Sequence, residues 1–216
     1  MNSDVAAFRD EYRAHIGAHY NGWLHFATTT VASLAAIAFA VWHVHAPSAG
    51  ELAAIPVYFV FANIAEYFGH RGPMHHRRRG LSLVFQRHTL EHHRFYTHEV
   101  MAADSPRDYK MVLFPPIMFV FFLGAIATPI GLVLGFVGTP NLGWLFAATG
   151  VGYFLTYEWL HFAYHQPESS WIGRNALVRR LRRNHQLHHD PARMTRANFN
   201  VTFPIADRLF GTFARD

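Results

Sequence analysis

The most constraining feature of this sequence is the separation of its apolar residues from its basic ones. Apolar residues gather in four blocks, and all 19 lysine and arginine residues lie outside them. The blocks are residues 23–42, 52–69, 111–138 and 142–160. A helix needs about 20 mainly apolar residues to cross a bilayer. A content of 51% hydrophobic residues would also suit a soluble protein, but this distribution predicts an all-α integral membrane protein with about four transmembrane helices.

The connections between the blocks predict the topology. The links at residues 43–51 and 139–141 contain no lysine or arginine, whereas the chain ends and the segment between the second and third blocks are basic. Because lysine and arginine concentrate in cytoplasmic loops, we predict a multi-pass protein of two hairpins with both termini and the basic segments on the cytoplasmic side. The same rule explains the net charge of +5, so we expect no nucleic-acid partner.

We interpret residues 1–216 as one membrane domain with five parts. These are an amphipathic interfacial helix at 1–22, a first hairpin at 23–69, a cytosolic segment at 70–110, a second hairpin at 111–160 and a cytosolic tail at 161–216. In the first part, apolar side chains recur at intervals of about four residues. The third apolar block exceeds one straight span and contains three prolines, so we expect it to kink or to lie partly in the interface.

Ten of the 17 histidines fall into four short boxes, all in the segments predicted to be cytosolic. They are His70 and His75; His88, His92 and His93; His161 and His165; and His185, His188 and His189. On a helix, residues three and four apart share a face, so His185 aligns with both His188 and His189. His188 and His189 differ by about 100° of rotation and can diverge toward two metal ions.

The other boxes differ in their helical spacing. His88 and His92 share a helical face, while His93 is turned toward another quadrant. His161 and His165 are also four residues apart, at the exit end of the fourth block.

The first box has a less favourable spacing. His70 and His75 are five residues apart, which separates them by about 140° on an ideal helix. Gly72 and Pro73 lie between them. We therefore expect the pair to converge only if the helix breaks and bends at these two residues.

The residue types restrict the metal chemistry. The sequence contains no cysteine, so a metal must be bound through nitrogen or oxygen, and imidazole suits zinc, copper, iron and nickel. Ten imidazoles are too many for one ion but suit two ions with room for an exchangeable ligand. Closed structural zinc sites usually include cysteine, which favours a dinuclear site of another kind.

Four side chains adjoin the boxes as possible partners of the metal ligands: Glu66, His76, His98 and Asp190. Glu66 lies four residues before His70, and it is expected either to accept a hydrogen bond from a ligand imidazole or to be a carboxylate at the membrane surface. By contrast, His15, His19, His43 and His45 lie outside the boxes, and we expect them not to bind metal.

A non-catalytic metal-binding or transport protein is an alternative of a different class. A transporter would normally place polar or ionisable ligands near the middle of the membrane. The four apolar blocks are nearly free of such residues, which favours an enzyme without excluding the alternative.

The four boxes, in order and spacing from His70 to His189, resemble those of the fatty acid hydroxylase superfamily. This superfamily of membrane-bound, O2-dependent enzymes includes sterol desaturases, fatty acid 2-hydroxylases and carotenoid hydroxylases. The resemblance assigns metal binding to the ten box histidines and implies two iron ions, for which zinc is an expected substitute in isolated protein. It also implies a di-iron oxidoreductase that uses O2 to hydroxylate or desaturate a lipid.

Within that resemblance, a fatty acyl chain or sphingolipid is the leading substrate class, and a carotenoid or a sterol is the alternative. The second box has three spacer residues where some fatty acid hydroxylases have two, which leaves the subfamily open. No cytochrome-like domain is fused to the chain, so we expect an external electron donor of the ferredoxin or cytochrome type. The sequence predicts neither the oligomeric state nor catalytic residues beyond the metal ligands.

Overall fold

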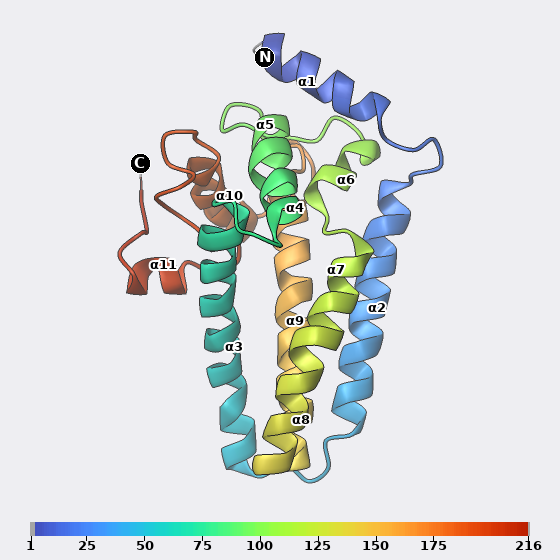
Figure 1. The fold of residues 1–216 in the computed structure, drawn as a ribbon, viewed down its shortest axis with the longest axis vertical. Helices are drawn as coiled ribbons and strands as arrows, with labels where there is room; N and C mark the ends of the chain where they lie inside the picture. The colour runs from blue at the N-terminus through green and yellow to red at the C-terminus, as the bar shows by residue number, and fades with distance from the viewer. Residues whose placement is uncertain (1–2, 216) are drawn as a thin grey trace. The chain divides into compact units, whose positions relative to one another are not determined.

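A computed structural model describes residues 3–215, and this part of the chain is helical without a β-strand. The chain divides into two compact units. Unit 1 comprises Met1–Trp23, Asn63–Leu113 and Trp159–Asp216, and unit 2 comprises Leu24–Ala62 and Phe114–Glu158. The all-α class predicted from the apolar blocks is confirmed. Figure 1 shows the order of the elements along the chain.

The helices have the following bounds. The α-helices are α1 (Ser3–Ala14), α2 (Gly22–Trp42), α3 (Ala49–Gly69), α4 (Ser82–Phe85), α5 (His93–Phe95), α6 (Tyr109–Val112), α7 (Pro116–Phe121), α8 (Thr128–Val137), α9 (Pro140–Tyr164), α10 (Ala176–His188) and α11 (Ile205–Leu209). The π-helical segments are η1 (His70–Met74), η2 (Gln86–His92) and η4 (Phe122–Ala127), and η3 (Pro106–Asp108) is a 3-10 turn.

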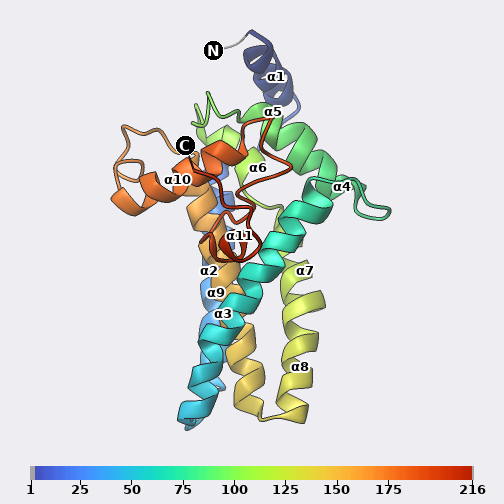
Figure 2. The same cartoon turned by 90° about the vertical axis from the view of Figure 1, so that its left-hand side faces the viewer.

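The apolar helices of unit 2 have roughly aligned axes in both ribbon views, and consecutive helices of each hairpin run in opposite directions (Figures 1 and 2). Large apolar side chains cover much of its surface, and Phe136 on α8 is 91% exposed. Apolar surface on this scale is typical of a membrane-contacting protein. By length and composition, three stretches could cross a membrane: Gly22–Trp42, Ala49–Met74 and Pro106–Val137. The fourth span, expected within α9, stays a prediction.

The helices α8 and α9 approach each other closely at two glycines. A Cβ atom on Gly143 of α9 would overlap the carbonyl oxygen of Gly131 on α8. Small residues allow such backbone contact between helices in membranes, where packing rather than the hydrophobic effect drives association. Glycine at these positions therefore sets the spacing of the second hairpin.

The two turns that were predicted from their lack of basic residues are hydrogen-bonded to each other. The Thr139 hydroxyl donates to the Glu51 carboxylate at 2.5 Å, and the His45 backbone N–H donates to the Asn141 side chain at 3.0 Å. Glu51 also accepts from the Ser48 backbone N–H. These contacts join the two hairpins of unit 2.

The third apolar block is interrupted, in agreement with its proline content. Residues 113–115 are not helical, α7 starts at Pro116, and the π-helical η4 separates α7 from α8. Glu158 of α9 is buried and accepts a hydrogen bond from the Phe114 backbone N–H at 3.3 Å. This buried carboxylate is one of the few charged residues within the apolar blocks, and it supports the backbone where the helix is broken.

Unit 1 contains most of the short helices and all four histidine boxes. A small apolar cluster, Tyr67, Phe199 and Ala206, joins the end of α3 to the C-terminal segment. The Asn175 side chain caps α10 by accepting from the backbone N–H groups of Leu177 and Val178, which satisfies donors that the first turn of a helix leaves free. Unit 1 thus holds the candidate site on segments that lie far apart in the sequence and are joined by long-range contacts.

Candidate metal centre

The box histidines of unit 1 come together in two buried groups. The five-histidine group contains His70, His75, His88, His93 and His188, and the four-histidine group contains His92, His165, His185 and His189. Within each group, one ring nitrogen from every residue lies within 4.8 Å of all the others. The tenth residue, His161, borders the four-histidine group, because its Nε2 lies 3.2 Å from that of His92.

Backbone carbonyl groups fix the orientation of five of these rings through Nδ1. The accepting carbonyl groups are those of Phe199 for His70, Ala197 for His188, Met111 for His92, Met101 for His165 and Tyr96 for His189. A neutral imidazole has one N–H, so donation from Nδ1 leaves Nε2 with a free lone pair. Hydrogen bonds of this kind orient histidine ligands in metal sites.

The Nε2 atoms then face one another at short distances. In the five-histidine group, the separations are 2.8 Å for His70 and His88, 2.9 Å for His75 and His188, and 3.1 Å for His93 and His88. In the four-histidine group, they are 3.2 Å for His92 and His189, 3.0 Å for His189 and His185, and 3.3 Å for His185 and His165.

The contact between His92 and His189 shows that the donor set fits metal ions. Nδ1–H of His92 donates to Met111 and Nδ1–H of His189 to Tyr96, so both Nε2 atoms are acceptors and no hydrogen bond can form between them. Two facing lone pairs repel each other unless a cation lies between them. The residues present therefore fit a cation-binding centre in the four-histidine group, and the five-histidine group offers the same nitrogen donors, which suit iron, zinc, copper or nickel.

Burial keeps these imidazoles neutral. It lowers the pKa of His75 to about 2, that of His92 to about 3 and that of His188 to about 4. The same cause, loss of hydration of the charged form, lowers the pKa of His185 and His189. Only a neutral imidazole has a lone pair for a metal, so the site is in its metal-binding protonation state at neutral pH.

π-helical turns determine which histidines of the first two boxes align. The expected helix break at Gly72 and Pro73 is wrong, because the helix continues through both as η1. Hydrogen bonds in a π-helix join residues five apart, and His70 and His75 therefore belong to one group.

The same effect applies in η2, where His88 joins the group of His93, five residues on. The rings of His88 and His92 stack with centroids 5.4 Å apart, so the two residues share a face as the sequence indicates, but they do not share a group. His92 belongs instead to the four-histidine group.

In α10 and its C-cap, the α-helical spacing distributes the histidines between the two groups. His185 and His189 lie in the four-histidine group, with their Nε2 atoms 3.0 Å apart. The intervening His188 lies in the five-histidine group. The rotation of about 100° between consecutive helical residues thus separates His188 from His189, as the sequence indicates.

The carbonyl groups that orient the five-histidine group lie in the C-terminal segment at residues 197–199, which two carboxylates support. Asp207 accepts from the backbone N–H groups of Phe199 and Asn200, at 2.9 and 2.7 Å. Glu66 accepts from those of Val201 and Thr202. Glu66, expected near the ligands, thus supports the segment whose Phe199 carbonyl accepts from a ligand imidazole.

The other three adjoining residues have different environments. His76 is exposed, and its Nδ1 lies 2.8 Å from the Arg71 carbonyl oxygen. His98 contributes its backbone carbonyl, which accepts from Gln186. Asp190 accepts from the Ala192 backbone N–H and pairs with Arg193 at 3.6 Å. A role for these side chains toward metal stays a prediction.

Sequence reasoning missed Arg9, the one fully buried charged side chain in α1. Its guanidinium donates to the backbone of residues 95–102, which also carries the carbonyl groups that accept from His165 and His189. No local pattern reveals it, because its partners lie 86 or more residues away.

Comparison with known proteins gives two matches. The family model described as fatty acid hydroxylase matches residues 55–212. A solved structure described as full-length scs7p, with only the hydroxylase domain visible, has a TM-score of 0.61 and 18% identity, covering 90% of this chain and 67% of that one. At this identity, the second match shows a shared fold. No curated protein sequence matches the chain significantly.

Proposed function

The chain belongs to the fatty acid hydroxylase family, and we propose on this basis that it is a membrane-bound, O2-dependent di-metal oxygenase that hydroxylates or desaturates a lipid. The observation that carries the proposal is the pair of histidine groups with facing, unprotonated Nε2 atoms. Ten box histidines, with His161 beside the four-histidine group, supply enough nitrogen donors for two ions. A fatty acyl chain or a sphingolipid is the leading substrate class.

The metals of this proposal are two iron ions, for which zinc would substitute in isolated protein. When bound, the iron would supply the activation of O2 that an unactivated C–H bond requires. The chain's own residues would hold the ions through Nε2, orient the rings through their carbonyl partners and exclude water by burial. His92, His165, His185 and His189 would hold one ion, and the five-histidine group the other.

The reaction requires an external supply of electrons. Hydroxylation inserts one oxygen atom of O2 into a C–H bond and reduces the other to water, which consumes two electrons and two protons. We propose that a separate ferredoxin- or cytochrome-type protein donates them. We also propose that both termini and the histidine boxes lie on the cytoplasmic side, because lysine and arginine residues concentrate in cytoplasmic segments.

Lipid analysis tests the reaction. Lipid extracts are compared by mass spectrometry between cells that express the chain and cells that do not. The proposal predicts a lipid that gains one oxygen atom or loses two hydrogen atoms, and the loss of that product with His188→Ala. The matched control is His15→Ala, which changes an exposed histidine directly after α1 and should preserve the product.

The identity of the lipid distinguishes the substrate classes. An oxidised carotenoid or sterol would replace the acyl proposal with the alternative substrate of the same chemistry. An unchanged lipid profile in cells supplied with iron, together with altered metal uptake or tolerance, would instead support a non-catalytic metal-binding or transport protein.

A further inference from the structure

The most unusual buried side chain outside the histidine groups is Arg9. It is 0% exposed, and its guanidinium donates to three backbone carbonyl groups and one carboxylate. Nε donates to Phe95 O at 2.8 Å, Nη2 to Val100 O and Ala102 O at 3.0 and 3.2 Å, and Nη1 to Asp104 at 3.1 Å. Burying a charge is costly unless it is paired and hydrogen-bonded, and here all of the pairing is directed at one loop.

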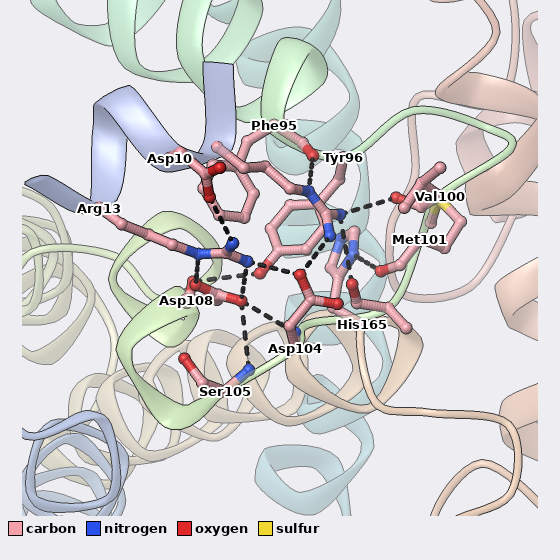
Figure 3. A network of polar contacts seen from close by, with 12 residues as sticks. Asp10, Arg13, Phe95, Tyr96, Val100, Met101, Asp104, Ser105, Asp108 and His165 are labelled. Carbon is pink, nitrogen blue, oxygen red and sulfur yellow. Dashed lines mark hydrogen bonds and ion pairs between the residues drawn. The ribbon is translucent and has the colours of Figure 1, made fainter. Parts of the chain in front are cut away.

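The carbonyl groups that Arg9 binds alternate with those that orient metal-site histidines. Next to Phe95, the Tyr96 carbonyl accepts from His189 Nδ1 at 2.5 Å. Between Val100 and Ala102, the Met101 carbonyl accepts from His165 Nδ1 at 2.7 Å. Arg9 thus binds carbonyl groups directly adjacent to the two that accept from the imidazoles, so holding the first set restrains the second. Figure 3 shows this network from Met101 and His165 to Asp104.

Ring contacts also connect Arg9 with the four-histidine group. The guanidinium carbon of Arg9 lies 4.9 Å from the ring centroid of Phe95 and 5.2 Å from that of Tyr96. The ring of Tyr96 lies 4.1 Å from that of His165. Arg9 therefore contacts both the backbone and a side chain that border the four-histidine group.

We propose that Arg9 is a positioning residue for the metal ion of the four-histidine group and not for that of the five-histidine group. This inference rests on the two-metal centre proposed above. Arg9 fixes the loop at residues 95–102 so that the carbonyl groups of Tyr96 and Met101 hold His189 and His165 with Nε2 toward the ion. The five-histidine group is oriented instead from Ala197 and Phe199, in a segment supported by Asp207.

The geometry requires arginine in particular. A guanidinium presents five N–H donors in a planar fork, whereas a lysine ammonium has three donors at one point. The acceptors of Arg9 extend from Phe95 to Asp104. A lysine can retain the charge but cannot reach all of these acceptors at once.

A neighbouring arginine on the same helix provides a matched control. Arg13, one turn after Arg9, donates to the carboxylates of Asp104 and Asp108 at 2.6 to 2.8 Å. Its guanidinium forms ion pairs and lies over the Phe95 ring. Arg13→Gln should therefore weaken the attachment of α1 without releasing the carbonyl groups of Tyr96 and Met101.

The test is a Co²⁺ titration of the full chain in detergent micelles, followed by visible absorption and by metal analysis after desalting. The wild-type chain should bind two ions. Arg9→Gln should bind one ion with wild-type affinity and the other about 10- to 100-fold more weakly, which is the usual effect of losing a group that orients a metal ligand. Arg9→Lys should show a smaller loss at the same ion, and Arg13→Gln should bind both ions as the wild type does.

A double variant assigns the effect to one group. In His189→Ala, the ion of the four-histidine group is already weakened, so adding Arg9→Gln should leave the remaining ion unchanged. The proposal is overturned if Arg9→Gln weakens the binding of both ions equally, weakens the binding of neither ion, or has the same affinities for the two ions as Arg13→Gln. If Arg9→Gln does not fold, Arg9→Lys decides by the same criteria. A wild-type chain that binds fewer than two ions would overturn the metal centre itself, a result distinct from a failure of Arg9 alone.

Discussion

His88 and His92 stack on each other, with ring centroids 5.4 Å apart and ring planes at 20°, yet they belong to different histidine groups. Both residues come from the π-helical turn η2. The Nε2 atom of His88 faces those of His70 and His93. The Nε2 atom of His92 faces those of His189 and of the flanking His161. One short turn thus supplies stacked histidines to the two different groups.

The first prediction follows from this division. His88→Ala and His92→Ala should each reduce the bound metal from two ions to one, because each removes a nitrogen donor from a different group. The double variant should retain little metal. Metal analysis of purified protein measures the result, with His15→Ala as the control. Loss of both ions from either single variant, with the helical content unchanged, would contradict the assignment to separate groups.

The second prediction concerns the histidines of unit 2. His43→Ala and His45→Ala should leave the metal content unchanged, because neither residue belongs to a histidine group and His43 instead stacks on Trp144. A hydrocarbon core of about 30 Å would separate them from the boxes in the two-hairpin topology. If either variant lost metal as His188→Ala does, without unfolding, both the topology and the ligand assignment would have to be abandoned.

The third prediction concerns the stability of the metal-free protein against acid. Burial lowers the pKa of His188 to about 4 and that of His92 to about 3, from about 6.5 in an unfolded chain. Below pH about 6.5 the unfolded chain therefore binds more protons than the folded one. Stability should be full above this pH and should fall as the pH drops toward 4.

Thermal unfolding of metal-free protein at pH 7.5, 6 and 5 measures this loss. His188→Gln removes one of the buried titrating groups and should make the dependence on pH shallower. An unfolding temperature that stays constant from pH 7.5 to pH 5 would show that these histidines are not buried in the neutral form.

The fourth prediction concerns the contact between α8 and α9. Gly143→Ala should lower the free energy of unfolding by about 1–3 kcal/mol, because the added Cβ would overlap the backbone of Gly131. Gly150→Ala is the matched control on the same helix, since a Cβ there would meet nothing within 4 Å. It should be neutral or stabilising, because alanine favours a helix more than glycine does. Thermal unfolding of both variants in the same detergent measures the two changes in stability. Equal changes in the two variants would argue against the close contact between α8 and α9.

The sequence by itself determined the helical class and the kind of chemistry. Apolar blocks of about 20 residues without lysine or arginine specify helices because every backbone polar group must be satisfied internally in lipid. The absence of cysteine excludes thiolate donors, and the clustering of ten histidines favours imidazole. Both are local properties of composition and spacing, which is why they can be read without a structure.

For the first two boxes, only the tertiary structure decided how the histidines are divided between the two groups, and for all four boxes it decided which contacts hold the rings in place. Spacing in α10 separates His188 from His189 correctly, but the π-helical turns η1 and η2 change which residues of the first two boxes align. A π-turn has no sequence signature of its own, because surrounding packing stabilises it. The role of Arg9 likewise depends on a loop 86 or more residues away, and contacts of that range arise only when the chain folds.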